Sequence, residues 1–177
     1  MLHAFKRLSV LPFLLAAALL GGCSLFESAP TPVKSTVVPD RDMIGAIRAA
    51  GDREKSVIDV NPLRDPGVAV LQDTAKSDEQ AARYADAAGK LDQALKLRPD
   101  SPDILQDRAE MAIHLKDFAT AERLAHQSWS LGPRLGPLCA RNWQTIVEMR
   151  LQAGDAGGAD TARKGVQVCH KAGIPRY

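Results

Sequence analysis

Residues 101–133, SPDILQDRAEMAIHLKDFATAERLAHQSWSLGP, decide the fold class of this chain. Ala, Leu, Gln, Arg, Lys, Glu and Asp dominate this stretch, as they do from Asp65 onward. Ser101-Pro102 supplies an N-cap residue followed by a proline at the first helical position, and Asp65-Pro66 and Gly136-Pro137 place a proline in the same way. No run alternates polar and apolar residues over the length of a strand. The sequence therefore predicts an all-α domain.

The stretch is also one unit of a repeat, because landmarks recur at a spacing of 34 residues. A third unit follows after about four inserted residues within LGPRLGP, residues 131–137. The landmark pairs are Leu71 with Leu105, Ala75 with Ala109, Ala87 with Ala121, Leu97 with Leu131, and Pro99 with Pro133.

At these positions the chain resembles the tetratricopeptide repeat (TPR) family, whose 34-residue unit is a helix-turn-helix. The resemblance implies a short solenoid of about three repeats, in which small residues allow the two helices of a unit to cross closely. The first helix of unit one is degenerate. The matches in units two and three are Leu105 and Ala109 in the first helix, Lys116-Asp117-Phe118 and Gly154-Asp155 in the turns, Ala121 and Ala159 at the crossings, Trp143, and Pro133.

The resemblance sets the expected domain boundaries. A helical domain spans 65–173, with a C-terminal tail at 174–177, and its units cover about 68–101, 102–135 and 140–173. The segment 41–64 has no assigned role. Residues 41–52 could form a short helix. An exposed end of the stack would be covered either by the polar surface of the last helix, about 156–172, or by the segment 41–64.

The N-terminus has the three parts of a secretory signal peptide: Lys6 and Arg7, the apolar run 8–20, and small residues after it. That run is too short to span a bilayer, which needs about 20 apolar residues. LLGGC, residues 19–23, resembles the lipobox of bacterial lipoproteins. The resemblance implies cleavage of residues 1–22, a diacylglyceryl group on the Cys23 sulfur and acylation of its new amine.

A Ser/Pro/Thr-rich stretch follows, so residues 23–40 are expected to be a lipidated tether. The residue after the lipidated cysteine influences sorting in this family. Ser24 is not the aspartate that commonly retains such proteins in the inner membrane. The resemblance therefore implies a lipid anchor in the outer membrane of a Gram-negative bacterium, on its periplasmic face.

Charge argues against nucleic acid as a partner. The full chain has 23 Lys and Arg against 21 Asp and Glu, and Lys6 and Arg7 account for the whole excess. A mature chain with balanced charge lacks the basic patch that neutralises phosphates.

The other two cysteines, Cys139 and Cys169, are expected to form a disulfide. They lie at the start of the first helix and the end of the second helix of unit three, and these ends meet in an antiparallel hairpin. The periplasm is oxidising, and two cysteines remain once Cys23 is lipidated. The alternative is two free, packed thiols. Zinc-ligand spacing is missing, so no metal site is expected.

The sequence contains no catalytic motif and predicts no enzyme and no cofactor: GxSxG, HExxH and GxxxxGK[ST] are all missing. In the TPR family, the first helices of the units line a concave groove that binds peptides. Gln72, Gln106 and Gln144 share one repeat position, so they form an amide ladder for an extended segment or are simply exposed helix residues. The groove residues implied by the resemblance are Gln72, Asp103, Gln106, Glu110, Ile113, His114, Arg141, Gln144, Glu148 and Leu151.

Together these features predict an outer-membrane lipoprotein that acts as a protein–protein adaptor in cell-envelope assembly. The partner machinery would serve secretion or pilus assembly, the outer membrane or peptidoglycan. The alternative is a small-ligand or glycan-binding protein, or a hydrolase subunit, that uses the same groove. Catalysis would need converging carboxylates such as Glu110 and Glu148. The oligomeric state stays open, and self-association through an uncapped end is a third possibility.

Overall fold

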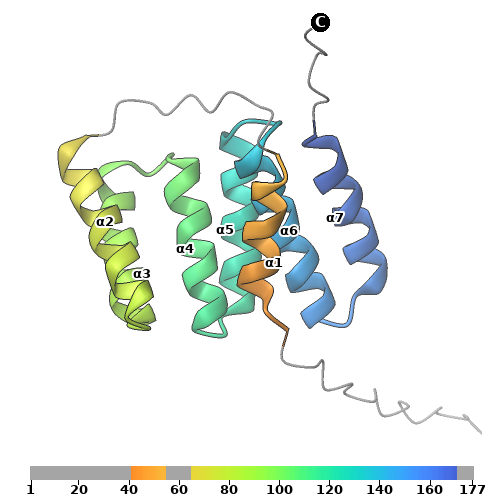
Figure 1. Cartoon of the computed structure of the whole chain (residues 1–177), viewed down its shortest axis with the longest axis horizontal. Helices are drawn as coiled ribbons and strands as arrows, with labels where there is room; N and C mark the ends of the chain where they lie inside the picture. The colour runs from red at the N-terminus through yellow and green to blue at the C-terminus, as the bar shows by residue number, and fades with distance from the viewer. Residues whose placement is uncertain (1–40, 55–64, 171–177) are drawn as a thin grey trace, which may run out of the picture. The chain divides into compact units, whose positions relative to one another are not determined.

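The computed structural model describes residues 41–54 and 65–170, and its labelled elements are all α-helices (Figure 1). These residues belong to one compact unit. The helices are α1 (Met43–Asp52), α2 (Pro66–Gln80), α3 (Tyr84–Leu97), α4 (Pro102–His114), α5 (Phe118–Leu131), α6 (Pro137–Gln152) and α7 (Ala156–Val168).

Six of the helices form three successive helix-turn-helix pairs: α2 with α3, α4 with α5, and α6 with α7. The pairs stand side by side along the stack, so each buries its apolar surface on its neighbour (Figure 1). Ala87, Ala121 and Ala159, the expected crossing residues, are all fully buried. The predicted all-α, TPR-like solenoid is confirmed.

The proline-led helix starts are also present, because Pro66, Pro102 and Pro137 each open a helix. Asp65 caps α2 by accepting hydrogen bonds from the amides of Gly67 and Val68. Ser101 occupies the predicted N-cap position of α4, but its side chain does not cap the helix. Its hydroxyl donates instead to the carboxylate of Asp103, 2.9 Å away, and makes no cap hydrogen bond.

The turns inside the three pairs share one backbone feature. Ala82, Lys116 and Gly154 each adopt a positive φ, of 57°, 61° and 75°. This left-handed conformation is unstrained for glycine and unfavourable for residues with a Cβ. Only the third pair therefore makes its turn without strain at this position.

The remaining helix, α1, belongs to no pair and packs on α6, with smaller contacts to α4. Residues 41–54 therefore contribute a helix to the side of the stack, and α1 does not cover an end of it as one alternative expected. Ile47 is fully buried among residues of α4, α5 and α6, because α4 and α6 leave an apolar surface between them. Within the described residues, no helix has the length and apolarity needed to cross a membrane.

Candidate functional site

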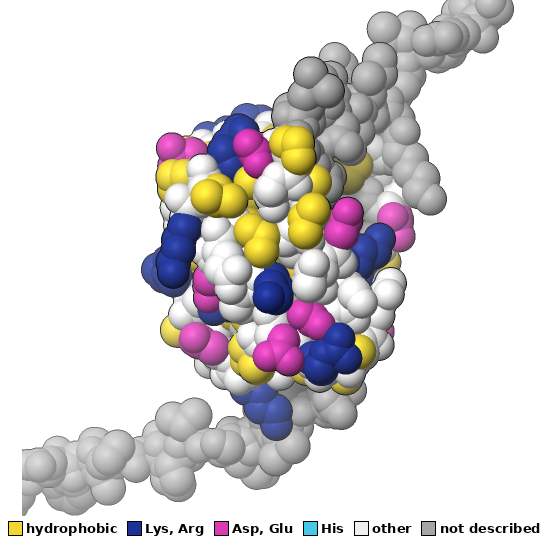
Figure 2. Space-filling model, turned by 90° about the vertical axis from the view of Figure 1, so that its left-hand side faces the viewer, with side chains coloured by type: hydrophobic (Ala, Val, Ile, Leu, Met, Phe, Trp, Pro, Cys, Tyr) yellow, Lys and Arg dark blue, Asp and Glu magenta, His cyan; other side chains and the backbone are white. Residues whose placement is uncertain are grey.

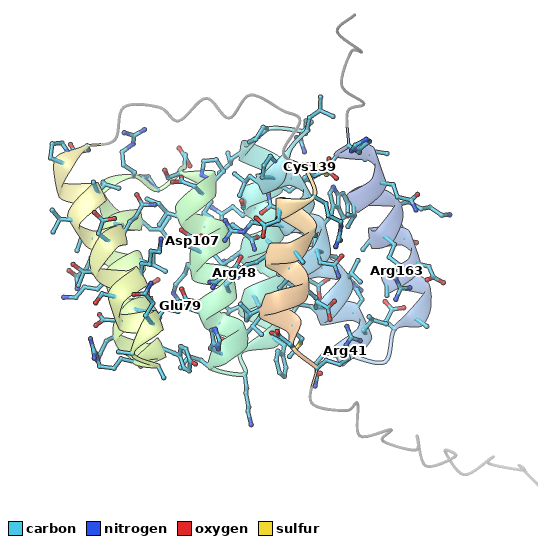
Figure 3. All side chains as sticks on the ribbon, in the orientation of Figure 1. Arg41, Arg48, Glu79, Asp107, Cys139 and Arg163 are labelled. Carbon is cyan, nitrogen blue, oxygen red and sulfur yellow. A yellow bond between two sulfur atoms is a disulfide. The ribbon has the colours of Figure 1, made fainter. Side chains whose placement is uncertain are left out.

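The candidate site is the face formed by α2, α4 and α6, the first helices of the three pairs, which we call the groove. Figure 3 shows α1 lying over it, with Arg48 directed toward Glu79 of α2 and Asp107 of α4 nearby. The expectation of an open groove is therefore corrected. Glu110 and Gln106 are 0% exposed and Glu148 is 3% exposed.

Glu110 of α4 is the centre of the site. One of its carboxylate oxygens accepts hydrogen bonds from Arg141 Nε at 3.0 Å and from Gln106 Nε2 at 3.1 Å. The other accepts from Arg48 Nε of α1 at 2.9 Å. Such charge-assisted bonds offset the cost of burying a carboxylate. Glu110 is therefore neutralised by one arginine of the groove and one of α1.

Arg141 of α6 links this centre to a second carboxylate, because its Nη2 lies 2.8 Å from the Asp107 carboxylate. Burial alone would lower the pKa of Arg141, but Glu110 and Asp107 raise it above the ordinary arginine value. Arg141 is thus held permanently charged within the groove.

Glu148 of α6 is a second buried carboxylate. It accepts a hydrogen bond from Gln144 Nε2 at 2.7 Å and forms an ion pair with Arg41, which lies just before α1. Glu110 is thus bound by two arginines and an amide of the same chain, and Glu148 by one arginine and one amide. This is the bonding pattern of buried ion pairs, not that of an acid/base carboxylate couple.

The three glutamines do not form a ladder open to a partner. Gln72 donates to Asp103 at 3.1 Å, and Gln106 donates to Thr145 at 2.9 Å as well as to Glu110. Gln72 and Gln106 are buried, so the reading of exposed helix residues is wrong for both. The sequence predicted that these glutamines lie on the groove side of the first helices, but it did not predict that they hydrogen-bond to other residues of the same chain.

Two other expected groove residues also lie in packed surroundings. Ile113 is buried in the cluster that receives α1, whereas Leu151 packs against the core cluster between α4, α5, α6 and α7. The placement of Leu151 in the groove is therefore corrected.

The uncovered part of the groove is an open pocket of about 420 Å³ between α1 and α2. His114 lines it and stacks on Tyr84, with ring centroids 3.9 Å apart. Partial burial lowers the pKa of His114 below its ordinary value, although Glu79 opposes the shift. The pocket is lined by Asp42, Ile44, Gly45, Arg48, Lys76, Glu79, Gln80, Tyr84 and His114.

Four residues that sequence reasoning missed complete the site: Arg41, Arg48, Glu79 and Asp107. Arg48 bridges Glu79 and Glu110, which lie 31 and 62 positions away in the chain. The sequence signal for Arg41 and Arg48 was their spacing of seven residues around an apolar stretch. Because this segment lies outside the repeat units, the repeat pattern did not place either arginine in the groove.

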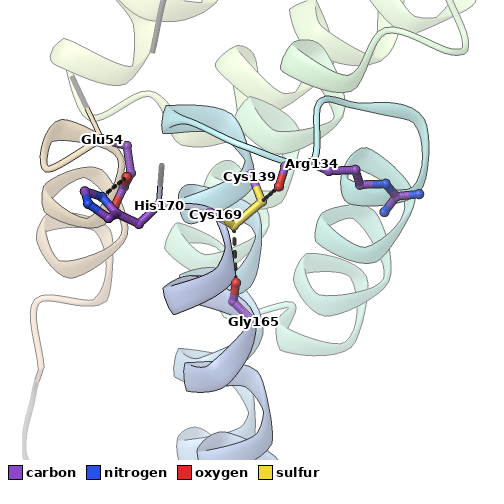
Figure 4. The surroundings of a disulfide bond; sticks show 6 residues. All are labelled: Glu54, Arg134, Cys139, Gly165, Cys169 and His170. Carbon is purple, nitrogen blue, oxygen red and sulfur yellow. Dashed lines mark hydrogen bonds and ion pairs between the residues drawn. A yellow bond between two sulfur atoms is a disulfide. The ribbon is translucent and has the colours of Figure 1, made fainter. Parts of the chain in front are cut away.

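A second feature lies at the end of the groove next to α1. Cys139 and Cys169 form a disulfide with an S–S distance of 2.04 Å (Figure 4). The bond joins the start of α6 to the residue that ends α7. Beyond it, His170 Nδ1 lies 2.9 Å from a carboxylate oxygen of Glu54, just after α1. The end of α7 thereby contacts the end of α1.

The α2–α3 end of the stack is the third surface of interest. Figure 2 shows this end with apolar side chains on its upper part and charged side chains around them. Val70 of α2 is 65% exposed and Leu97 of α3 is 58% exposed. Self-association through this end remains a prediction.

Over residues 41–54 and 65–170, no cluster of three or more His, Cys, Asp or Glu side chains is arranged to hold a metal ion. Cys23, the signal peptide and the tether lie outside the described residues, so lipidation remains a prediction from the sequence.

These features can be compared with known proteins. The chain is similar to the globular C-terminal domain of P. aeruginosa LpoP. The two share 28% sequence identity with a TM-score of 0.56, and the match covers 59% of this chain and 99% of that structure. The sequence matches no protein-family model and no curated protein.

Proposed function

We propose that this protein is a lipoprotein of the outer membrane, facing the periplasm, that regulates peptidoglycan synthesis by binding a protein partner. The lipobox-like sequence before Cys23 supports the anchor. The similarity to LpoP favours the peptidoglycan machinery among the envelope processes considered from the sequence. The protein acts as a binding partner and not as an enzyme.

One observation carries the binding role: the groove already holds a helical segment. α1 is bound there by apolar contacts of Ile47 and by ion pairs of Arg41 and Arg48 with groove carboxylates. A surface with buried carboxylates beside an apolar strip suits a basic amphipathic helix, which is a common mode of peptide recognition. The partner segment in this proposal binds the same face.

The test is capture from crosslinked cell envelopes with two matched charge reversals. Glu79→Lys changes the groove and breaks an ion pair with Arg48, whereas Asp92→Lys changes α3 and breaks an ion pair with Arg108. We expect wild type and Asp92→Lys to capture a peptidoglycan-synthesis protein and Glu79→Lys to lose it. Equal capture by all three would contradict the groove assignment. Capture of proteins from another process only would contradict the assignment to peptidoglycan.

A further inference from the structure

The contact between α1 and the groove differs from the contacts within the helix pairs. It combines an apolar strip, in which Ile47 and Ala50 are buried and Met43 and Ile44 partly buried, with the ion pairs of Arg41 and Arg48. Gly51 allows a close approach, because a Cβ at this position would lie 2.8 Å from Arg141 Cγ. The fit is therefore specific to this segment.

α1 is a weak helix without the groove. It has only 10 residues and contains Gly45 and Gly51. Isolated helices shorter than about 12–15 residues are marginal in water, and each interior glycine costs about 1 kcal/mol relative to alanine. Such an element opens locally at a lower free energy than the whole domain.

Opening of α1 would change the charge of the groove in a defined way. Asp107 and Glu110 keep Arg141, but Glu110 and Glu79 lose Arg48, and Glu148 loses Arg41. Removing one partner of a buried ion pair is costly, so the opened groove favours a segment that returns positive charge to these carboxylates. A segment without basic side chains at the positions of Arg41 and Arg48 would leave them without a counter-charge.

We propose that α1 is an exchangeable occupant of the groove, and that the partner replaces it with a helix of the same chemistry. This inference rests on the proposed binding function and names its ligand class. The partner segment carries two Arg or Lys residues seven positions apart, the first just before a helix and the second within it, as Arg41 and Arg48 are arranged around the start of α1. Small and aliphatic residues lie between them, as in residues 41–54.

The test uses the full chain and a fluorescent peptide of residues 41–54, RDMIGAIRAAGDRE. Arg48→Glu in the chain weakens docking of its own α1, whereas Arg53→Glu changes an exposed residue at the end of the same helix. We expect the peptide to bind the Arg48→Glu chain about tenfold more tightly than wild type, because more grooves are open. The Arg53→Glu chain should match wild type, and a peptide with both Arg41 and Arg48 changed to Glu should not bind.

If the wild-type, Arg48→Glu and Arg53→Glu chains bind the peptide equally, or if none binds it, the proposal that α1 is exchangeable is wrong. This conclusion would not depend on the result of the envelope capture. Loss of the captured partner in Glu79→Lys together with absent peptide binding would leave the groove assignment intact and reject only this inference. Hydrogen exchange of the wild-type chain gives a second test, which does not depend on the folding of any variant. We expect α1 amides to exchange faster than those of α4, and equal protection would also overturn the proposal.

Discussion

The first and third helix pairs have the same topology but are stabilised by different interactions. In α6–α7, Gly154 makes the turn without strain, Asp155 caps the second helix, and a disulfide joins the two outer ends. In α2–α3, Ala82 takes the same left-handed conformation, and α3 begins after Arg83 without a side-chain cap. One repeat pattern can therefore specify a fold while the stability of each copy is set by residues outside that pattern.

The largest expected effect is removal of the disulfide that closes the third pair. The double variant Cys139→Ser/Cys169→Ser should lower the free energy of unfolding by about 3–4 kcal/mol, because the bond closes a loop of about 30 residues. Urea unfolding followed by circular dichroism measures the change. A loss below about 1 kcal/mol would show that the third pair does not depend on this bond.

Replacing one glycine by alanine in the second helix of each pair should change the free energy of unfolding in opposite directions. Gly165→Ala would place a Cβ too close to the Trp143 ring and should destabilise by about 1–3 kcal/mol through overpacking. A Cβ at Gly89 would meet no other heavy atom within 4 Å, so Gly89→Ala should stabilise α3 by about 0.5–1 kcal/mol. Thermal unfolding of both variants against wild type is the measurement, and a destabilising Gly89→Ala would break the comparison.

Exchanging the residues at the left-handed turn position should bring the stabilities of the first and third pairs closer together. Ala82→Gly should stabilise the first pair by about 0.5–1 kcal/mol, because glycine adopts a positive φ without steric cost. Gly154→Ala should destabilise the third pair by about 1–2 kcal/mol for the same reason. Urea midpoints that move in the same direction for both variants would contradict the strain assigned to Ala82.

The smallest effect concerns pH. The pKa of Asp155 is lowered because its carboxylate accepts a hydrogen bond from the Gly158 amide. The cap therefore stabilises α7 above the unfolded aspartate pKa, about 3.9, and this contribution is lost as pH falls through the lower folded pKa. Amide protection of Gly158 should decrease on acidification in wild type and be low at all pH values in Asp155→Ala. The first turn of α3 has no side-chain cap hydrogen bond to lose, so the protection of its amides should fall less over the same pH range; an equal loss there would rule out the cap as the cause.

The stack of helix pairs was accessible from the sequence because its determinants are local. Proline starts, helix-forming composition and small crossing residues such as Ala121 each act within one unit of 34 residues. The hairpin geometry also indicated where Cys139 and Cys169 lie relative to each other, and the structure places them in a disulfide.

The state of the groove was decided only by the tertiary structure. Glu110 and Glu148 were expected to face a partner, yet they are buried under α1, 62 and 107 positions from the arginines that bind them. No periodicity connects positions so far apart. The sequence allowed a short helix at 41–52, but no local pattern indicated that this helix would lie on the groove. Local patterns determined the helices and their order, whereas long-range charge pairing and burial determined which face remains open.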